Sequence, residues 1–522
     1  MDSALMDKEV LCILDTRQIQ RFMFRSNSFE DTLGGSDLMV HILADGILYA
    51  LQNVAPPLSP EEYNLSQDPD APIPFFTDAR TQFQLIYCTA GNALFLARTG
   101  ELAQKIIRKI SRYYLDNVYT LNLAAAAVQK TDNLGKDIFE LYKKLNAIKA
   151  SASISVPLSP LPVVMREERT GEPVIKYDKK TGAGISMSSF LRRQEAERRG
   201  KVISLTDIVC SEGANRKKYR AVLHIDGNNI GITIGRLLQV TSDYQKGIRI
   251  RRSINTRLKN EYEQFVQKTI SDLKNYHAHL PMQRQDFSHE FQLIHNNGDD
   301  VNCMCTADLI FPFLHFFFKN IESASVGEVD GQRIPLYCCA GICFATEEYD
   351  FHSAYNLAEE CCESAKKEAK KDCNLRDGLA GNWFDFHICG NHQIQELELM
   401  REQIAVTDSN VHLICRPYCL DAEADGKPFS YKTLLSRVQA FKQIRRQHGA
   451  KLLDNLRQNY YLDRLIFVDQ IQQLKDAGID MEALLGLPFC RDEDGNTCAA
   501  WYDALEVLPF MNSDSNETGR SA

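Results

Sequence analysis

Three aspartates, Asp226, Asp299 and Asp300, combine a residue type and a setting that suit metal chemistry. Asp226 ends an apolar, strand-like segment that begins at Leu223, and the acidic pair follows a second such segment that begins at Phe291. Two strands that meet side by side would bring the three carboxylates together. Carboxylates fixed on rigid strands form a hard oxygen site, which suits Mg²⁺ or Mn²⁺ holding nucleotide phosphates.

The acidic pair also has a simpler interpretation. Asn297-Gly298 directly precedes it, and this dipeptide is a strong signal for a type I′ turn. An ordinary β-hairpin with a solvated acidic tip would have the same local sequence. Spacing alone therefore leaves the metal site and the plain hairpin both open.

Composition limits the possible functions. The chain has 522 residues, of which 44% are hydrophobic and 25% are charged, which is a globular balance. This length is too great for one core, so we expect two to four domains. The net charge of -9 and the pI of about 5.8 exclude a general nucleic-acid polycation, so any nucleic-acid contact must use local patches.

Cysteine usage indicates a reducing compartment. The 16 cysteines include no pair of CxxC motifs, so we expect buried thiols in a cytoplasmic protein and no zinc. The longest apolar run, Leu309 to Phe318, is too short to span a bilayer and contains Pro312 and His315. We therefore predict a buried helix there and no membrane partner.

The elements that must position the aspartates recur in two halves. The first half predicts, in order, a strand at Val10–Asp15, a helix at Leu38–Leu51 capped by Ser36, a hairpin over Phe83–Ala97, a helix at Glu101–Tyr114 and a strand at Tyr119–Ala127. The second half predicts a strand at Tyr219–Asp226, a loop, a helix at Ser253–Tyr276, the Asn297-Gly298 hairpin, a helix at Thr306–Ile321, a strand at Tyr337–Ala345, a helix at Phe351–Lys371 and a strand at Trp383–Cys389. This order indicates a strongly diverged internal duplication.

Several short motifs, taken in order, resemble one known family. They are Asp-Gly-Asn-Asn-Ile-Gly at 226–231, Asn-Gly-Asp-Asp at 297–300, Ala340-Gly341-Ile342 and the helix Ala354–Lys366. Together they resemble the GGDD cyclase palm of the polymerase-like large subunit of type III CRISPR effector complexes, and more distantly the GGDEF cyclases. In the first half, Asp15 and Leu33-Gly34-Gly35-Ser36 match the family's first palm. Arg416-Pro417-Tyr418 and Trp501–Ala504 resemble parts of its C-terminal region.

The resemblance implies an α+β fold with two ferredoxin-like palms, each an antiparallel sheet with helices on one face, and a helical C-terminal domain. The expected division is a degenerate first palm at 1–150, a linker and zinc-free remnant module at 151–205, and a second palm with the GGDD-like hairpin at 206–393. A helical domain at 394–511 and a disordered tail at 512–522 follow.

The implied function is a nucleotidyl cyclase that makes cyclic (oligo)nucleotides from ATP in prokaryotic antiviral signalling. Asp226, Asp299 and Asp300 would be the catalytic residues and would hold two Mg²⁺ or Mn²⁺ ions. The nucleotide-binding residues would be Asn228, Asn297, Gly298 and Lys366. For Lys366, a plain solvated helix position beside Lys367 is the simpler alternative. The pocket would lie between the two palms.

Three departures from the family pattern bear on activity. Asn297 replaces the first glycine, which is mild because Asn tolerates positive φ. Asn228 replaces a second aspartate and offers an oxygen without charge, which predicts weak activity with Mg²⁺ and better activity with Mn²⁺. Alternatively, Asn228 only caps the turn after the strand. Gly91-Asn92-Ala93 replaces the acidic pair of the first palm, so we expect that palm to be silent.

The alternative function is a catalytically weak scaffold subunit that binds RNA or other subunits of an effector complex. Two basic stretches could make such contacts. The first, Arg192 to Arg199, is interleaved with Glu195 and Glu197, so a solvated, salt-bridged face is favoured. The second, Lys246 to Lys259, contains no acid and follows the catalytic strand, so phosphate or RNA contact is plausible there.

Overall fold

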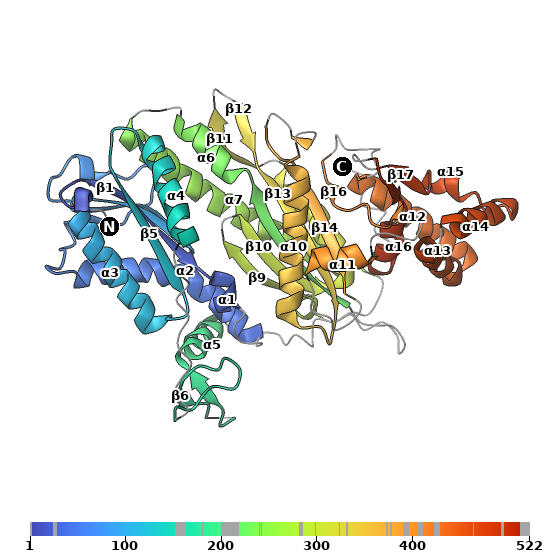
Figure 1. Cartoon of the computed structure of the whole chain (residues 1–522), viewed down its shortest axis with the longest axis horizontal. Coiled ribbons are helices and arrows are strands. Elements are labelled where there is room, and N and C mark those ends of the chain that lie inside the picture. Colours follow the sequence, from blue (N-terminus) through green and yellow to red (C-terminus); the bar gives the residue numbers. More distant parts are fainter. Residues whose placement is uncertain are drawn as a thin grey trace.

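The computed structural model describes residues 3–23, 29–151, 163–179, 181–199, 219–239, 241, 243–280, 286–297, 299–322, 324–329, 332–371, 374–375, 378–389, 396–404, 411–421, 429–462, 464–491 and 495–511. The N-terminal α/β region, a central α/β region and a C-terminal helical region follow one another along the long axis (Figure 1). The first two regions are the palms that the sequence predicts.

The first palm is built on a five-stranded sheet with the order β2-β3-β4-β1-β5. Val10, Cys12 and Leu14 of the first strand pack against the second and third helices. Leu11 and Ile13 point to the opposite face and pack against the fourth helix, because successive side chains of a strand alternate. The elements are β1 (Val10–Arg17), α1 (Ile19–Met23), α2 (Phe29–Asn53), β2 (Tyr63–Asn64), β3 (Phe83–Cys88), β4 (Asn92–Ala97), α3 (Gly100–Asn117), β5 (Asn122–Gln129) and α4 (Leu134–Ser151).

The second palm is built on a six-stranded sheet with the order β16-β14-β13-β8-β10-β9. Its elements are β8 (Tyr219–Asn228), α6 (Ile230–Gln239), α7 (Tyr244–Ala278), α8 (Phe287–Glu290), β9 (Phe291–Asn297), β10 (Asp300–Thr306), α9 (Ile310–Ile321), the hairpin β11 (Ser325–Val329) and β12 (Gln332–Pro335), β13 (Tyr337–Thr346), α10 (Phe351–Ala369) and β14 (Trp383–Ile388). The apolar run at Leu309 to Phe318 lies in or beside α9 and is largely buried, as predicted.

The two palms repeat one topology. The order β1-α2-β3-β4-α3-β5-α4 of the first corresponds to β8-α7-β9-β10-α9-β13-α10 of the second. In space, β3-β4-β1-β5 corresponds to β9-β10-β8-β13. Both are ferredoxin-like βαββαβ units with one further helix, so the predicted duplication and the predicted α+β palm fold are confirmed. Helices cover both faces of each sheet, however, and not one face as predicted.

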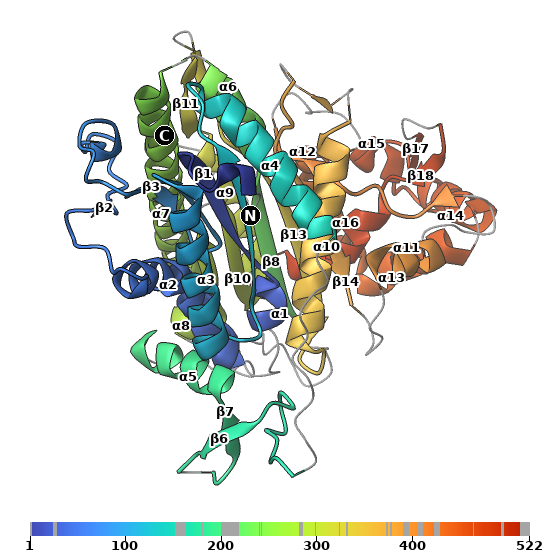
Figure 2. The same cartoon turned by 60° about the vertical axis from the view of Figure 1, so that its left-hand side comes forward.

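Each palm lends a helical segment to the other. Met23, Phe29 and Leu33 of the first palm pack into the core beneath α10, and the rings of Phe29 and Phe351 lie 5.2 Å apart. In Figure 2, α1 lies beside α10. Conversely, the α6–α7 segment, through Leu238, Tyr244 and Ile248, packs into the α4 face of the first palm. The palms therefore share two hydrophobic cores.

The module between the palms contains β6 (Val174–Tyr177), β7 (Gly184–Ser186) and α5 (Met187–Arg199), and projects below the first palm in Figures 1 and 2. Helix α5 packs so closely on α2 that a Cβ at Gly34 would overlap the backbone of Arg192. Inside the module, the buried carboxylate of Glu172 accepts hydrogen bonds from Tyr119 (2.7 Å) and Ser188 (2.6 Å). Buried polar contacts thus hold this module to the first palm.

The C-terminal region is mostly helical. It contains α11 (Leu397–Ile404), α12 (Tyr431–His448), α13 (Ala450–Leu462), α14 (Arg464–Asp476), α15 (Met481–Leu485) and α16 (Tyr502–Val507), with a small sheet of β15 (Val411–His412), β18 (Thr497–Ala499) and β17 (Phe489–Arg491). Strand β16 (Tyr418–Cys419) pairs with β14 of the second palm. Asp503 accepts hydrogen bonds from Tyr418 (2.9 Å) and Arg416 (3.2 Å), so two motifs far apart in sequence meet here.

Two predicted helix boundaries are wrong. Ser36 does not cap a helix, because α2 already begins at Phe29 and Ser36 lies two turns inside it. The segment predicted as a loop between Asp226 and Ser253 instead contains helix α6, whose apolar residues Leu237 and Leu238 are buried. The helix predicted to begin at Ser253 is α7, which already begins at Tyr244. The stretches 152–162 and 201–218 and the predicted tail at 512–522 lie outside the described residues. Within the part of the chain that the structure describes, no helix is long and apolar enough to span a bilayer.

Candidate active site

The candidate site lies where β8 ends, beside the β9–β10 hairpin. Strand β8 runs between β10 and β13, with Ile225 opposite Val301 and Asp226 opposite Cys339. Asp300 is the first residue of β10 and precedes Val301, so its strand position is next to that of Asp226. The tertiary structure thus brings the two acidic segments of the sequence to one end of one sheet.

Asp299 reaches this place because Gly227 has no side chain. An ideal Cβ placed on Gly227 would lie 2.8 Å from Cβ and 2.9 Å from Oδ2 of Asp299. Real Cβ atoms do not come that close, so only glycine allows the hairpin tip to rest on the end of β8. Gly227 therefore fixes the distance between the acidic hairpin and the strand that carries Asp226.

The carboxylates repel one another. Burial and the neighbouring charge of Asp226 raise the pKa of Asp299 from its usual value near 4 to about 7. The charge of Asp300 acts in the same direction, and that of Lys366 opposes it. Such a cluster of partly buried negative charge is a place where a cation would be stabilised.

Lys366 contacts this cluster through Asp226 and does not lie at a solvated position. Its Nζ contacts Oδ2 of Asp226, and its side chain is only 10% exposed. Burial alone would lower the pKa of Lys366, but the carboxylate of Asp226 outweighs it and raises the pKa. Helix α10 thus delivers to the aspartates the lysine that the sequence indicated, and the alternative of a plain solvated position does not hold.

Asp300 is held by polar side chains that the sequence reasoning missed. Nδ2 of Asn302 donates to Oδ1 of Asp300 at 2.6 Å, and Nδ1 of His224 lies 3.6 Å from the same oxygen. Nε2 of His295 lies 4.0 Å from Oδ2. The sequence did contain a signal for these residues. Side chains alternate between the two faces of a strand, and each of these polar residues interrupts an apolar strand on the same face as the aspartates.

The other three residues that the family resemblance implies for nucleotide binding are Asn228, Asn297 and Gly298, and their surroundings differ. Nδ2 of Asn228 donates to the carbonyl oxygen of Gly381 (2.8 Å) and contacts Sγ of Cys339 (3.0 Å), while its Oδ1 has no hydrogen-bond partner among the described residues. Asn297 ends β9, and Gly298 lies outside the described residues. Asn229, just before α6, has a φ of 63°, a backbone strain typical of functional turns.

The first palm has a matching but incomplete constellation. Asp15 lies opposite Asn92, which takes the place of Asp300, and Gly91 takes the place of Asp299. Nζ of Lys149, from α4, lies 2.7 Å from Oδ2 of Asp15, as Lys366 from α10 contacts Asp226. The strand aspartate and its lysine are therefore common to both palms, and the acidic pair is not.

The two basic stretches are largely structural. Arg192 is fully buried, and Arg193 forms an ion pair with the buried Asp31. In the second stretch, Arg252 is buried and donates to backbone carbonyl oxygens of the first palm, and Arg251 stacks on Tyr87. The basic residues of that stretch that remain exposed are Lys246, Arg249, Arg257 and Lys259.

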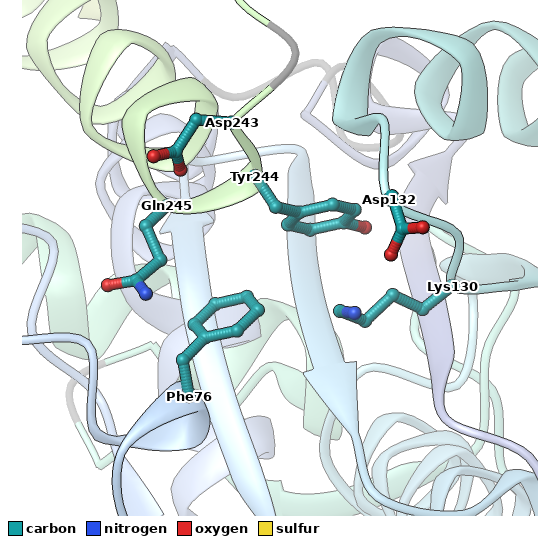
Figure 3. A pocket seen from close by; sticks show the side chains of 6 residues that line it. All are labelled: Phe76, Lys130, Asp132, Asp243, Tyr244 and Gln245. Carbon is teal, nitrogen blue, oxygen red and sulfur yellow. The ribbon is translucent and has the colours of Figure 1, made fainter.

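A cavity of about 420 Å³ lies elsewhere, between the first palm and the start of α7. Figure 3 shows Phe76 and Tyr244 beside the ammonium group of Lys130, which lies 4.8 Å from the centre of the Tyr244 ring. Lys130 follows the end of β5 that pairs with Val10, whereas Asp15 lies at the opposite end of the sheet. This cavity is therefore separate from the carboxylates.

The carboxylates are not arranged as a finished metal centre. Among the described residues, no group of three His, Cys, Asp or Glu side chains is placed to hold a metal ion. Asp226 is engaged by Lys366 and Asp300 by Asn302. The donor set nevertheless fits a hard divalent cation, because its oxygens are carboxylates. Burial and then the charge of Asp226 raise the pKa of Asp299, and a bound cation would offset that repulsion.

Comparison with known proteins agrees with this geometry. Residues 219–375 match the family model of the second palm domain of Cas10/Cmr2. This segment contains Asp226, the acidic hairpin and Lys366. No curated protein sequence matches the chain.

Solved structures share the fold at low sequence identity. An apo Csm1–Csm4 cassette gives a TM-score of 0.52 at 13% identity, covering 98% of this chain and 71% of the other. Csm1 from T. onnurineus and a Csm1–Csm4 cassette in complex with cA4 each give 0.51 at 13% identity, covering 97% and 70%. Residues 219–375 thus match the second palm domain of Cas10/Cmr2, and the chain as a whole shares its fold with Csm1.

Proposed function

We propose that this protein is a cytoplasmic, metal-dependent nucleotidyltransferase that joins ATP into cyclic oligoadenylates. The observation that carries the proposal is the convergence of Asp226, Asp299 and Lys366 at the end of β8, on the side where the palms meet. A buried lysine among repelling carboxylates suits a substrate that brings both phosphates and a divalent cation.

The solved structures support the substrate class. Csm1–Csm4 cassettes have been crystallised with cA4, with pppApA and with one ATP, and each shares the fold at a TM-score of 0.51. Their identity to this chain is 12–13%, so they support the proposal through the fold, and the residues of this chain carry the chemistry.

In the proposed reaction, Asp226, Asp299 and Asp300 hold Mg²⁺ or Mn²⁺. When bound, such ions lower the pKa of a ribose 3′-hydroxyl and neutralise charge on the α-phosphate. The 3′-oxygen then bonds to the α-phosphorus of a second ATP, the bond to the β-phosphate oxygen breaks, and pyrophosphate leaves as the hydroxyl proton passes to solvent. Repetition and ring closure give the cyclic product.

Lys366 has two successive partners in this proposal. In the structure its ammonium group contacts the carboxylate of Asp226. With a cation held by Asp226, the ammonium group of Lys366 would be available to the triphosphate, the contact that the family resemblance implies for this position. Asn228, Asn297 and Gly298 are proposed to line the nucleotide site beside it.

The proposed division of labour follows the domains. The first palm (1–150) is silent, because one carboxylate, Asp15, cannot hold two ions, and the second palm (206–393) does the chemistry. The module at 151–205 is proposed to be a zinc-free remnant, and the helical domain spans 394–511.

A second candidate function is a catalytically weak scaffold subunit that binds RNA or other effector subunits. The contact of Lys366 with Asp226 favours it, since it leaves no metal-ready trio among the described residues. The exposed cations of α7, Lys246, Arg249, Arg257 and Lys259, would then be the RNA-binding positions.

One experiment separates the two functions. Purified protein is incubated with ATP and either Mn²⁺ or Mg²⁺, and the products are identified by mass spectrometry. Cyclic adenylates and released pyrophosphate are expected from the wild type and from the control variant Arg257→Ala, but not from Asp299→Ala/Asp300→Ala. Absence of product with both metals, together with RNA binding that Arg257→Ala weakens, would support the scaffold instead.

A further inference from the structure

A row of three polar side chains lies directly behind the aspartates in the second palm. On β10, Asn302 pairs with His224 of β8 on one side and with His295 of β9 on the other. Oδ1 of Asn302 lies 2.7 Å from Nδ1 of His224, and its Nδ2 donates to Asp300. All three side chains are at most about one-tenth exposed.

The first palm has no such row. The corresponding positions, two residues behind Asp15 and Asn92, are Ile13, Leu94 and Tyr87, which pair in the same register. Ile13 and Leu94 belong to the apolar core of that palm. Burying polar groups costs stability unless they are hydrogen-bonded, so the polar row is a costly feature restricted to the palm that carries the acidic pair.

A side chain of the first palm completes the row. Oγ of Ser36, on α2, lies 2.7 Å from Nδ1 of His295, and Ser36 is 2% exposed. When the serine hydroxyl donates to Nδ1, the proton of the histidine is on Nε2, which lies 4.0 Å from Oδ2 of Asp300. That distance suits an electrostatic contact or one bridging water.

We propose that His224, His295, Asn302 and Ser36 are positioning residues for Asp300, and that Ser36 makes the orientation of this carboxylate depend on the docking of the first palm. The inference rests on the proposed function, since it takes Asp300 to be a metal ligand. It assigns a specific task to the silent palm, which is to set the tautomer and angle of His295.

The test compares two variants that each remove one hydroxyl from the contact between the palms. Ser36→Ala removes the hydroxyl that reaches His295. Tyr244→Phe removes the hydroxyl that donates to Asp137 at 3.1 Å, at the far end of the first palm. Mn²⁺ binding is measured by electron paramagnetic resonance without nucleotide, so the readout does not require catalysis. Thermal unfolding reports on folding.

We expect Ser36→Ala to weaken Mn²⁺ binding by about three- to tenfold, the effect of one lost hydrogen bond. Tyr244→Phe should leave the Mn²⁺ affinity unchanged even if it lowers the melting temperature. If both variants weaken Mn²⁺ binding equally, or neither does, the link from Ser36 to Asp300 is overturned.

Two substitutions of His295 test the direction of the link. Gln places an amide near the position of Nε2, whereas Asn places one near Nδ1. His295→Gln should therefore keep more of the Mn²⁺ affinity than His295→Asn, which keeps only the partner of Ser36. A merely structural histidine would show the reverse order or equal losses.

The outcomes also separate this inference from the proposed function. Wild-type protein that binds Mn²⁺ but is indifferent to Ser36→Ala and His295→Asn overturns the positioning role and leaves the metal site standing. Wild-type protein that binds no Mn²⁺ overturns both.

Discussion

The two palms are the same unit put to different uses. Each begins with a strand that carries an aspartate near its end, Asp15 or Asp226, and each receives a lysine from its last helix. Gln18 and Asn229 both lie three residues after that aspartate, with φ angles of 64° and 63°. They are the two non-glycine residues with positive φ in the part of the chain that the structure describes. The strand-to-helix turn has thus been duplicated intact.

The difference lies in where the side chains are. In the second palm, Gly227 is bare and Asp299 fills the space against it. In the first palm the positions are reversed: Thr16 follows the aspartate, and the hairpin tip is Gly91. The hydroxyl of Thr16 lies 3.0 Å from that of Tyr114, within the palm. At the end of its first strand, the first palm therefore has a contact between two neutral hydroxyl groups. At the corresponding place, the second palm has a cluster of carboxylates.

The fold that the two palms share, here called the frame, is thus separable from the residues that are proposed to act in catalysis. Topology, turn strain and the lysine contact are common to both palms, so they belong to the frame. The acidic tip, the bare glycine and the polar row of His224, Asn302 and His295 occur in the second palm alone, so they belong to the proposed chemistry.

The largest expected effect tests which palm is active. Asp299→Ala/Asp300→Ala should reduce product formation by at least ~10³-fold, about 4 kcal/mol of activation free energy, because the proposed metal ligands are lost. Asp15→Ala should leave product formation within about twofold of wild type. Quantitative mass spectrometry of the products measures both, and equal losses would mean that the two palms share the chemistry.

The second prediction concerns the contact between Gly227 and the hairpin tip that carries Asp299. Gly227→Ala places a Cβ 2.8 Å from that of Asp299, so the hairpin tip must shift. Displacing a ligand by about 1 Å should lower turnover by about 10²-fold.

Gly235→Ala is the matched control, because a Cβ at this exposed position of α6 meets nothing within 4 Å. It should leave turnover unchanged and stabilise the helix slightly. Initial rates of pyrophosphate release compare the two variants, and a Gly227→Ala enzyme as fast as the control would show that the hairpin tip need not touch β8.

The third prediction concerns pH and the charge that only the second palm carries. The pKa of Asp299 is raised to about 7 in the folded protein, so folding becomes less favourable as the pH rises from about 4 through 7. Asp299→Asn removes this penalty. Without metal, the variant should melt at a higher temperature than wild type at pH 8, and the advantage should shrink as the pH falls towards about 5. A difference that is constant with pH would refute the raised pKa.

The smallest expected effect tests whether Asn228 contributes to the metal site or only stabilises the turn after β8. Its Nδ2 donates to the carbonyl oxygen of Gly381, and an aspartate would place an acceptor against that carbonyl. Asn228→Asp should therefore destabilise the fold by about 1–3 kcal/mol, read as a lower melting temperature.

Metal titrations complete the test of Asn228. The missing charge predicts better turnover with Mn²⁺ than with Mg²⁺ in wild type. If Asn228 contributes its oxygen to the site, Asn228→Asp should narrow that difference despite the lost stability. Identical metal curves for both proteins would assign Asn228 to the turn alone.

Local structural patterns can be predicted from the sequence of this chain alone. The alternation of apolar residues and the Asn297-Gly298 turn predicted the hairpin of β9 and β10, and the repeated order of elements predicted the duplication. Asp226, Asp299, Asp300 and Lys366 could be named because residue type and motif order are visible in the chain. Helix starts were less certain, since Gly34-Gly35 suggests an interruption where close packing of α5 in fact requires glycine.

The long-range side-chain contacts could not be predicted in this way, because they depend on how the folded units pack. That Ser36 contacts His295, that Lys366 contacts Asp226 and that Arg252 is buried in the first palm depend on contacts between residues more than 100 positions apart. No local propensity encodes such contacts. They arise because two amphipathic units bury their apolar faces against each other, and the packing of those faces then fixes which polar groups are brought together.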